Sequence, residues 1–165
     1  MATITLKGNP IQTIGELPAV GTKAPDFSLR TTSLDTTTLA DYAGSKLILN
    51  IFPSVDTGTC AASVRNFNKQ ASELNNTKII CVSRDLPFAH QRFCGAEGID
   101  NVISASDISG DFVKAYQLQV AEGPLEGLAS RSVVVLDENG TVIYTEQVAE
   151  TVDEPNYEAA LNAVS

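Results

Sequence analysis

The chain has 165 residues, of which 43% are hydrophobic and 19% are charged, and this composition is typical of a globular protein with a proper core. A net charge of −9 without any cluster of lysines and arginines argues against binding to nucleic acid or to an anionic membrane surface. No stretch is apolar over a length that could span a membrane, and the first residues do not resemble a signal peptide. We therefore expect one domain over residues 1–165 and a cytoplasmic location.

The first predicted element is a hairpin at residues 3–14, where apolar and polar residues alternate around a Gly/Asn/Pro turn. After a connector, strands alternate with helices, and the last two strands form a second hairpin before the final helix. The strands are expected at 27–29, 36–39, 47–52, 78–83, 101–105, 132–136 and 141–144. The helices are expected at residues 59–74, 85–94 and 111–118, and from Pro155 onward. This order predicts an α/β fold in which helices cover both faces of a mixed sheet.

The helix expected at 59–74 begins with a cysteine. Its apolar residues recur with a spacing that defines one helical face: Cys60, Val64, Phe67, Ala71 and Leu74. Cys60 is therefore expected in the first turn, facing inward, where unpaired N–H groups and the helix dipole stabilise a thiolate. The Thr57 hydroxyl can point at the sulfur or at an oxygen bound beside it, and Pro53 can form an apolar lid. The alternative is a buried cysteine that merely begins a helix.

Three cysteines in a chain of this size do not make a disulfide framework. Cys81 lies in a strand that is apolar on both sides, so we expect a core thiol. Cys94 is expected at the end of the helix that Asp85 caps and Gly95 ends. Because helix ends fray, Cys94 could leave its place and reach another sulfur, although a structural thiol is equally open. A thiolate oxidised by peroxide becomes a sulfenic acid, which condenses with a second thiol.

The single histidine, His90, offers two further alternatives. His90 and Cys94 are spaced as metal ligands on one helix, but the sequence lacks a Cys-x-x-Cys motif and Cys81 is expected to be buried, so no metal site is predicted. A Cys–His hydrolase would need His90 beside Cys60 with an orienting partner, and no such partner is recognisable. An exposed helix histidine is the interpretation we adopt.

The motif Pro53-x-x-x-Thr57-x-x-Cys60 resembles the peroxidatic motif of the peroxiredoxins. The longer stretch 50–65, together with Asp85-Leu-Pro-Phe-Ala and Arg92-Phe-Cys-Gly-Ala-Glu-Gly, is similar to the bacterial thiol peroxidase branch of that family, an atypical 2-Cys group. The similarity runs nearly from end to end. It implies a thioredoxin-like fold that carries residues 3–14 as an N-terminal hairpin extension.

The resemblance also implies roles for single residues. Cys60 would be the peroxidatic nucleophile and Cys94 the resolving cysteine, joined in an intramolecular disulfide. Arg131, otherwise expected to be a solvated charge, matches an arginine that lies beside the peroxidatic sulfur in the family. Thr57 and Arg131 would orient the peroxide and stabilise charge on its leaving oxygen. The chemistry needs no metal and no bound organic cofactor.

The function that follows is a thiol-specific peroxidase for hydrogen peroxide and organic (alkyl) hydroperoxides, serving antioxidant defence and redox homeostasis. The resemblance implies thioredoxin, with its reductase, as electron donor, and a homodimer. A redox sensor or binding module that uses the same cysteine switch is the alternative, and it would oxidise once and stall. The loop at 123–129 and the residues near Arg131 are expected to shape the substrate pocket.

Overall fold

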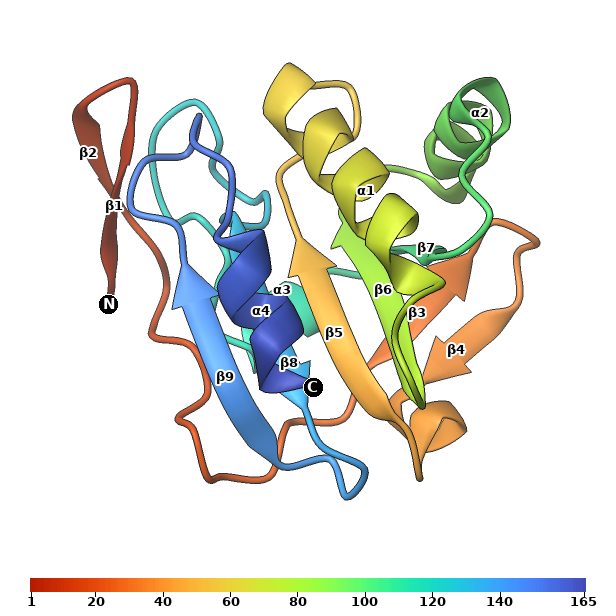
Figure 1. The fold of residues 1–165 in the computed structure, drawn as a ribbon. Coiled ribbons are helices and arrows are strands. Elements are labelled where there is room, and N and C mark those ends of the chain that lie inside the picture. Colours follow the sequence, from red (N-terminus) through yellow and green to blue (C-terminus); the bar gives the residue numbers. More distant parts are fainter.

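A mixed sheet of seven strands forms the central layer of the computed structural model, which describes residues 1–165 (Figure 1). Its strands are β3 (Ser28–Thr31), β4 (Thr36–Thr38), β5 (Lys46–Ile51), β6 (Thr77–Ser83), β7 (Ile103–Ser106), β8 (Ser132–Leu136) and β9 (Val142–Gln147). They lie in the order β4-β3-β7-β6-β5-β8-β9. β5, β6 and β7 run parallel, whereas β3 and β8 are antiparallel to their neighbours β7 and β5. The predicted mixed sheet is confirmed.

The helices that cover the sheet are α1 (Gly58–Ala71), α2 (Pro87–Glu97), α3 (Asp111–Ala115) and α4 (Tyr157–Ala163). One buried cluster joins α1, α2 and α4 to one face of the sheet, and a second joins α3 to the other face, as Figure 1 shows. α1 and α3 end earlier than predicted, and a short 3-10 helix, η1 (Leu39–Tyr42), was not predicted. None of the helices has the length and apolar character that crossing a membrane requires.

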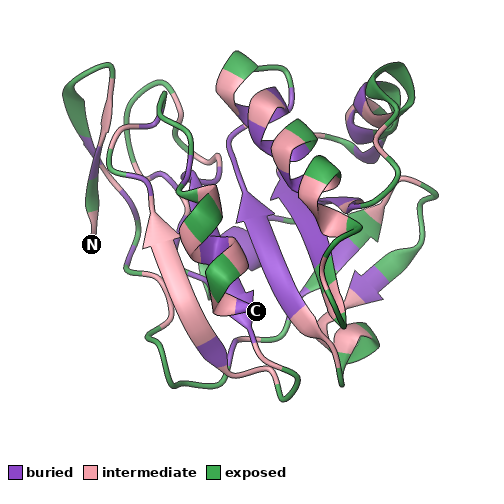
Figure 2. Cartoon of the chain, in the orientation of Figure 1, coloured by how far each residue is buried: buried purple, intermediate pink, exposed green.

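Strand β5 is buried on both of its faces, which explains its continuous apolar run. Leu47, Leu49 and Ile51 belong to the cluster on the α3 side, whereas Ile48 belongs to the cluster on the α1 side. β6 and β8 pair with β5 on either side, and Figure 2 shows how deeply β5 and β6 are buried. The loop that follows β5 therefore begins at a strand that is paired on both edges and buried on both faces.

The hairpin predicted at residues 3–14 is confirmed as a separate two-stranded sheet of β1 (Thr3–Leu6) and β2 (Asn9–Gln12). Ile4 and Ile11 face each other across the hairpin, and both are buried in a small cluster with Val120. Its turn needs two residues with positive φ, and Gly8 supplies one of them at 83°. Figure 1 shows the hairpin beside the segment that joins β9 to α4.

Helix α2 differs from its prediction at both ends. Asp85 does not cap it, since no side chain bonds to the first-turn N–H groups. The helix also continues past Gly95, and Gly98 ends it in the left-handed conformation with a φ of 66°. A glycine adopts that conformation readily because it lacks a Cβ. Cys94 therefore lies within the last turn of α2 and not at its end.

Candidate active site

Cys60 lies in the first turn of α1, after the loop that leaves the carboxyl end of β5. Thr57 caps the helix: its Oγ1 accepts a hydrogen bond from the Cys60 N–H at 3.4 Å and donates one to the Ser54 carbonyl at 3.1 Å. The Cys60 side chain is 0% exposed and belongs to the cluster on the α1 side of the sheet. Cys60 thus has the inward-facing position expected, whereas the Thr57 hydroxyl bonds to the backbone and not to the sulfur.

Arg131 reaches the sulfur from β8. Because β8 runs antiparallel to β5, the residue that precedes β8 lies beside the carboxyl end of β5. Arg131 is 3% exposed, and its Nη2 donates to Cys60 Sγ at 3.3 Å while its Nε donates to the Thr151 carbonyl at 2.9 Å. Its Nη1 is buried and has no hydrogen-bond partner. A guanidinium stays charged at any accessible pH, so the sulfur lies beside a fixed cation that still has an N–H to donate.

The loop between β5 and α1 is held by a carboxylate from another part of the chain. The Ser54 hydroxyl donates to Asp85 Oδ1 at 2.7 Å, and the Val55 N–H donates to Asp85 Oδ2 at 2.9 Å. The Ser83 hydroxyl donates to the same Oδ2. The neighbouring Pro53 is buried. Asp85 therefore ties the segment before Cys60 to the segment before α2, a role that its expected capping of α2 did not foresee.

The prediction that His90 is exposed is wrong. His90 is 0% exposed, its Nε2 lies 3.0 Å from Ser83 Oγ, and its Nδ1 has no hydrogen-bond partner. Burial lowers the pKa of His90, and the nearby Asp85 carboxylate opposes that shift. The buried residues of α2 are Pro87, His90 and Phe93, and this three-residue spacing was a visible signal of an inward face. His90 pairs with a serine and not with a cysteine.

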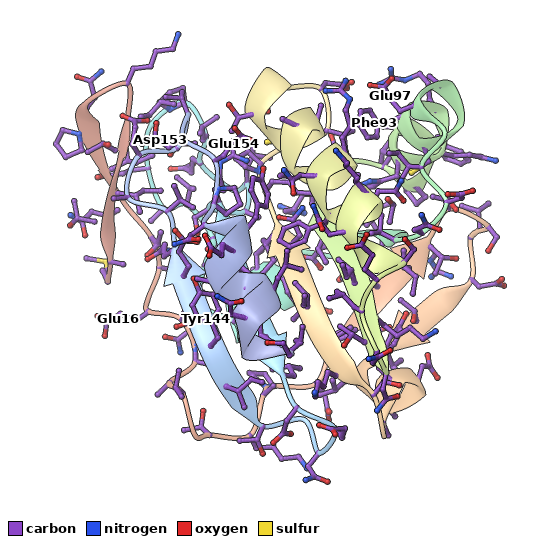
Figure 3. The ribbon with its side chains drawn as sticks, viewed as in Figure 1. Glu16, Phe93, Glu97, Tyr144, Asp153 and Glu154 are labelled. Carbon is purple, nitrogen blue, oxygen red and sulfur yellow. The ribbon has the colours of Figure 1, made fainter.

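Cys94 lies half-buried on α2, and its Sγ is 3.2 Å from Ser104 Oγ on β7. All three cysteines are unpaired. Two ion pairs hold this helix against the Cys60 region: Arg92 with Asp56 at 2.6 Å, and Arg65 with Glu97. Figure 3 labels Glu97 and Phe93 on the side of α2 that faces α1, and the Arg65 guanidinium stacks 5.8 Å above the Phe93 ring.

Cys81 has the buried position that the sequence predicts for a core thiol, at 0% exposure. Burial raises its pKa to about 12, and a hydrogen bond from the Asn50 amide only partly opposes that shift. The same amide donates to Ser63 Oγ at 3.1 Å, and the Ser63 hydroxyl donates to the Cys60 carbonyl at 2.7 Å. Cys81 is thus a neutral thiol at physiological pH.

Tyr157 on α4 (Tyr157–Ala163) is a further residue near the sulfur, and its place there was not predicted from the sequence. Its hydroxyl donates to Glu154 Oε1 at 2.7 Å, and its ring packs edge-on against Phe67 at 5.2 Å. Burial, followed by the hydrogen bond with Glu154, raises the pKa of Tyr157. The charges of Arg131 and Cys60 act on it as well, with opposite signs. Tyr157 therefore stays a neutral phenol beside the Arg131–Cys60 pair.

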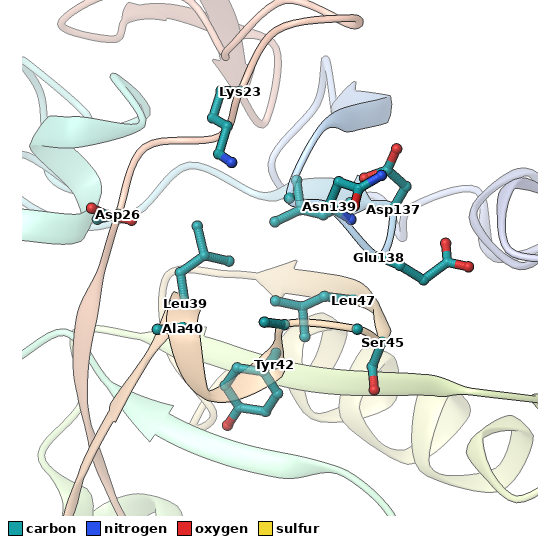
Figure 4. A pocket seen from close by; sticks show the side chains of 14 residues that line it. Lys23, Asp26, Leu39, Ala40, Tyr42, Ser45, Leu47, Asp137, Glu138 and Asn139 are labelled. Carbon is teal, nitrogen blue, oxygen red and sulfur yellow. The ribbon is translucent and has the colours of Figure 1, made fainter.

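A cavity of about 470 Å³ lies elsewhere in the molecule (Figure 4). It is lined by Leu47 at the amino end of β5, by Tyr42 of η1, and by the turn that follows β8, including Asp137. β5 spans roughly 20 Å, so this cavity is at the opposite end of the strand from the Cys60 loop. It contains no cysteine and no residue of the loop at 123–129. The expectation that this loop shapes a substrate pocket stays a prediction.

Comparisons with known proteins agree with the geometry. The Redoxin family model matches residues 19–161. Thiol peroxidases of Mycobacterium bovis and Mycobacterium tuberculosis are each 51% identical to the chain over 164 residues, which cover 99% of both sequences.

Two solved structures are also similar. A peroxiredoxin-like protein from Aquifex aeolicus matches with a TM-score of 0.95 and 34% identity, over 99% of this chain and 96% of that one. A thiol peroxidase from Chromobacterium violaceum, at 23% identity, shares the fold with a TM-score of 0.89 over 96% and 93% of the two chains. The chain therefore belongs to the redoxin family and, within it, to the thiol peroxidases, which are peroxiredoxin-type enzymes.

Proposed function

We propose that this protein reduces hydrogen peroxide and organic hydroperoxides with Cys60 as the peroxidatic cysteine. The observation that carries the proposal is the 3.3 Å contact between the Arg131 guanidinium and the Cys60 sulfur, both buried, with the guanidinium nitrogen Nη1 still without a hydrogen-bond partner. A peroxide oxygen placed beside the sulfur can therefore accept a hydrogen bond from a donor that is already oriented.

In the first step the Cys60 thiolate attacks the terminal oxygen of the hydroperoxide. A sulfur–oxygen bond forms and the oxygen–oxygen bond breaks, so sulfur is oxidised to a sulfenic acid and the leaving oxygen departs, after protonation, as water or an alcohol. Arg131 Nη1 donates to the peroxide as negative charge grows on the leaving oxygen. The reaction needs no metal and no organic cofactor.

Thr57 and Pro53 act beside the sulfur in this proposal. Thr57 fixes the first turn through the Cys60 N–H, and its hydroxyl donates to a peroxide oxygen only after it leaves the Ser54 carbonyl. Pro53 is buried in the same loop and has no N–H, so it can exclude water without offering a competing donor.

In the second step the Cys94 thiol attacks the sulfenic acid, which gives a Cys60–Cys94 disulfide and water. Cys94 contacts Ser104 on β7, and β7 and β5 are second neighbours in the sheet. The two sulfurs are unbonded, with Cys60 Sγ in contact with Arg131 and Cys94 Sγ in contact with Ser104, whereas the Cα atoms of a disulfide lie within ~7 Å. The first turn of α1 or the end of α2 must therefore leave its place before the bond can form.

The reductant in this proposal is a thioredoxin, whose dithiol returns two electrons and two protons to the disulfide. The similarity to thiol peroxidases supports this choice of reductant. On the same basis we propose that the chain is a single domain over residues 1–165, that two 17.5 kDa chains form a homodimer, and that the protein is cytoplasmic.

The test is to treat the reduced protein with one equivalent of hydrogen peroxide, block free thiols and map peptides without reductant. We expect a link between Cys60 and Cys94, with Cys81 still blocked as a thiol. Cys60→Ser should consume no peroxide, whereas Cys81→Ser should form the same link as the wild type.

Other products of that treatment contradict parts of the proposal. An unreacted Cys60 would exclude the peroxidase step. A sulfenic Cys60 beside a free Cys94 would exclude the resolving role of Cys94. A protein that forms the link but stalls after one equivalent, in the presence of thioredoxin and its reductase, would be a sensor and not an enzyme.

A further inference from the structure

The N-terminal hairpin lies outside the main sheet, yet it is bonded to the segment that follows β9. The Thr5 N–H donates to the Ala149 carbonyl at 2.7 Å, and the Thr151 N–H donates to the Thr5 carbonyl at 2.7 Å. β1 therefore pairs with residues 149–151 for a short distance, as an added strand would.

Glu150, at the centre of this pairing, receives four hydrogen bonds. Its Oε1 accepts from Thr5 Oγ1 at 2.9 Å and from the Gly8 N–H at 2.7 Å, while its Oε2 accepts from the Lys7 N–H at 3.1 Å and from the Val152 N–H at 3.0 Å. The backbone donors, those of Val152 and Gly8 first, lower the pKa of Glu150 to about 2. One ionised carboxylate thus joins the hairpin turn to the segment at 149–152.

The other side of this segment holds the reactive groups. The Thr151 carbonyl accepts the Arg131 Nε–H at 2.9 Å, and the Val152 carbonyl accepts the Thr59 hydroxyl at 2.9 Å. Thr59 directly precedes Cys60 in the first turn of α1. In Figure 3, Asp153 and Glu154 mark the continuation of the segment between the hairpin and the start of α1. Glu150 is therefore directly followed by the two residues whose carbonyls accept hydrogen bonds from Arg131 and from the first turn of α1.

We propose that Glu150 is a positioning residue for the peroxidase reaction, because it clamps the N-terminal hairpin onto the segment at 149–152 and so aims Arg131 at Cys60. This inference rests on the proposed roles of Cys60 and Arg131. It gives the hairpin, which is remote in sequence from both residues, a function in catalysis.

Apart from the hairpin, the segment is held by the Val148 N–H on the Arg131 carbonyl and by the Thr59 hydroxyl on the Val152 carbonyl, each at 2.9 Å. Ala149, Val152 and residues 153–154 are exposed, and Thr151 is buried but leaves its own hydroxyl without a partner. If the hairpin were released, the Thr151 carbonyl would be free to shift and the guanidinium would lose the acceptor that sets its direction. A displacement of the order of 1 Å in a positioned group can cost about a hundredfold in rate.

A carboxylate is the only side chain that fits these four donors. Glutamine of the same shape keeps one acceptor oxygen, and its NH₂ group would face two N–H donors of the backbone. Glu150→Gln therefore removes about half of the clamp's hydrogen bonds without changing the side-chain volume. Glu146→Gln is the matched control, since Glu146 lies on β9 and accepts a hydrogen bond from the Asn156 N–H and none from the hairpin.

The test compares two rates for each reduced variant, both read on the plateau at high pH. One is the rate at which hydrogen peroxide oxidises Cys60, and the other is the rate at which iodoacetamide alkylates it, a reaction that needs no donor to an oxygen. In Glu150→Gln we expect the peroxide rate to fall about tenfold while alkylation is no slower than in the wild type. Glu146→Gln should keep both rates. An unchanged ratio of the two rates in Glu150→Gln would overturn the inference.

A double-mutant cycle with Arg131→Gln separates this inference from the proposed function. If Glu150 acts through Arg131, the Glu150→Gln change should slow the peroxide step no further once Arg131 is replaced. If Arg131→Gln alone leaves the peroxide rate unchanged, the proposed function is wrong. If Arg131→Gln slows the peroxide step, but Glu150→Gln has no effect on that rate or slows it by the same factor with and without Arg131, only the inference about Glu150 is wrong.

Thr5→Val provides a second variant if Glu150→Gln does not fold. It removes one donor to Oε1, together with the longer 3.3 Å contact of the same hydroxyl to the Ala149 carbonyl, and keeps the backbone pairing of Thr5, so we expect the same selective loss of the peroxide rate, about threefold. Exchange of the Arg131 Nε–H with water, followed by NMR, should be faster than in the wild type. A Thr5→Val protein with wild-type peroxide rate and wild-type exchange would contradict the inference.

Discussion

At the scale of single residues, Arg131 combines three tasks in one rigid group. Its Nε is oriented by the Thr151 carbonyl, its Nη2 contacts the Cys60 sulfur, and its Nη1 is left for a ligand. The planar fork fixes all three directions at once, which a flexible ammonium cannot do. Burial keeps water from competing for the unpaired N–H.

Arg131→Lys should therefore be far more damaging than the retained charge suggests. We expect the rate constant for Cys60 oxidation by hydrogen peroxide to fall about a hundredfold, as on loss of one oriented donor to a developing oxyanion. Rapid quench with mass spectrometry measures it. Arg30→Lys, the same change on an exposed residue of β3, is the control. Wild-type speed in Arg131→Lys would mean that charge alone suffices.

The sequence predicted these site residues unevenly. Cys60 could be placed from helical spacing, because the face of α1 is periodic from its first turn. The contact between Arg131 and Cys60 depends on antiparallel pairing of β8 with β5, and only the family resemblance pointed to it. Glu150 could not be predicted, since its donors are backbone N–H groups of a distant hairpin that leave no mark in the side-chain pattern.

At the scale of elements, α2 and the Cys60 loop are bonded to each other, and the proposed Cys60–Cys94 disulfide requires that one of them leave its place. Asp85 holds them together with hydrogen bonds from Ser54, Val55 and Ser83, and its own segment leads into α2. The exposed ion pair of Arg92 with Asp56 contributes less, because solvent screens it.

Asp85→Asn should speed the resolving step. The amide keeps a single acceptor oxygen, so at least one of the three hydrogen bonds is lost, at about 1 kcal/mol each. We expect disulfide formation about five- to tenfold faster in a rapid-quench assay with N-ethylmaleimide. Asp35→Asn, on an exposed turn, is the control. Disulfide formation at the wild-type rate in Asp85→Asn would argue that Asp85 does not restrain this motion.

The elements themselves were largely predictable, because strand burial and helix periodicity are local signals. The ends of α2 were not. Asp85 is a residue type that often caps helices, but its carboxylate accepts hydrogen bonds from the Ser54 hydroxyl and the Val55 N–H and none from the first turn of α2. Two glycines, Gly95 and Gly98, could each have ended the helix, and local sequence does not decide between them.

At the scale of the whole molecule, the buried His90 makes stability depend on pH. In the unfolded chain a histidine binds a proton near pH 6.5, whereas burial lowers the pKa of His90 in the fold. Below about pH 6.5 the unfolded state therefore binds more protons, and stability falls as pH falls until the folded state is protonated too. Glu150 acts in a lower window, since its stabilising effect is present above the unfolded carboxyl pKa and is lost as pH drops toward about 2.

Urea unfolding between pH 5 and pH 8 tests the contribution of His90. We expect the wild-type free energy of unfolding to decline below about pH 6.5, with a slope of at most about 1.4 kcal/mol per pH unit from this one group. In His90→Gln the contribution of His90 to this pH dependence of the unfolding free energy should vanish. Because the chain has one histidine, no other imidazole titrates in this pH range. Parallel curves for the two proteins would contradict the assignment.

The buried Cys81 also matters at the scale of the whole molecule, because it determines how many sulfurs of the chain can be oxidised and reduced. A thiol whose pKa is raised to about 12 offers almost no thiolate for exchange, although it lies in the same core cluster as Cys60. We therefore expect the third sulfur to take no part in redox chemistry, and in the proposed cycle each chain exchanges two electrons through Cys60 and Cys94. In the proposed cycle an odd number of cysteines thus coexists with an even-electron couple, because only Cys60 and Cys94 are oxidised and reduced.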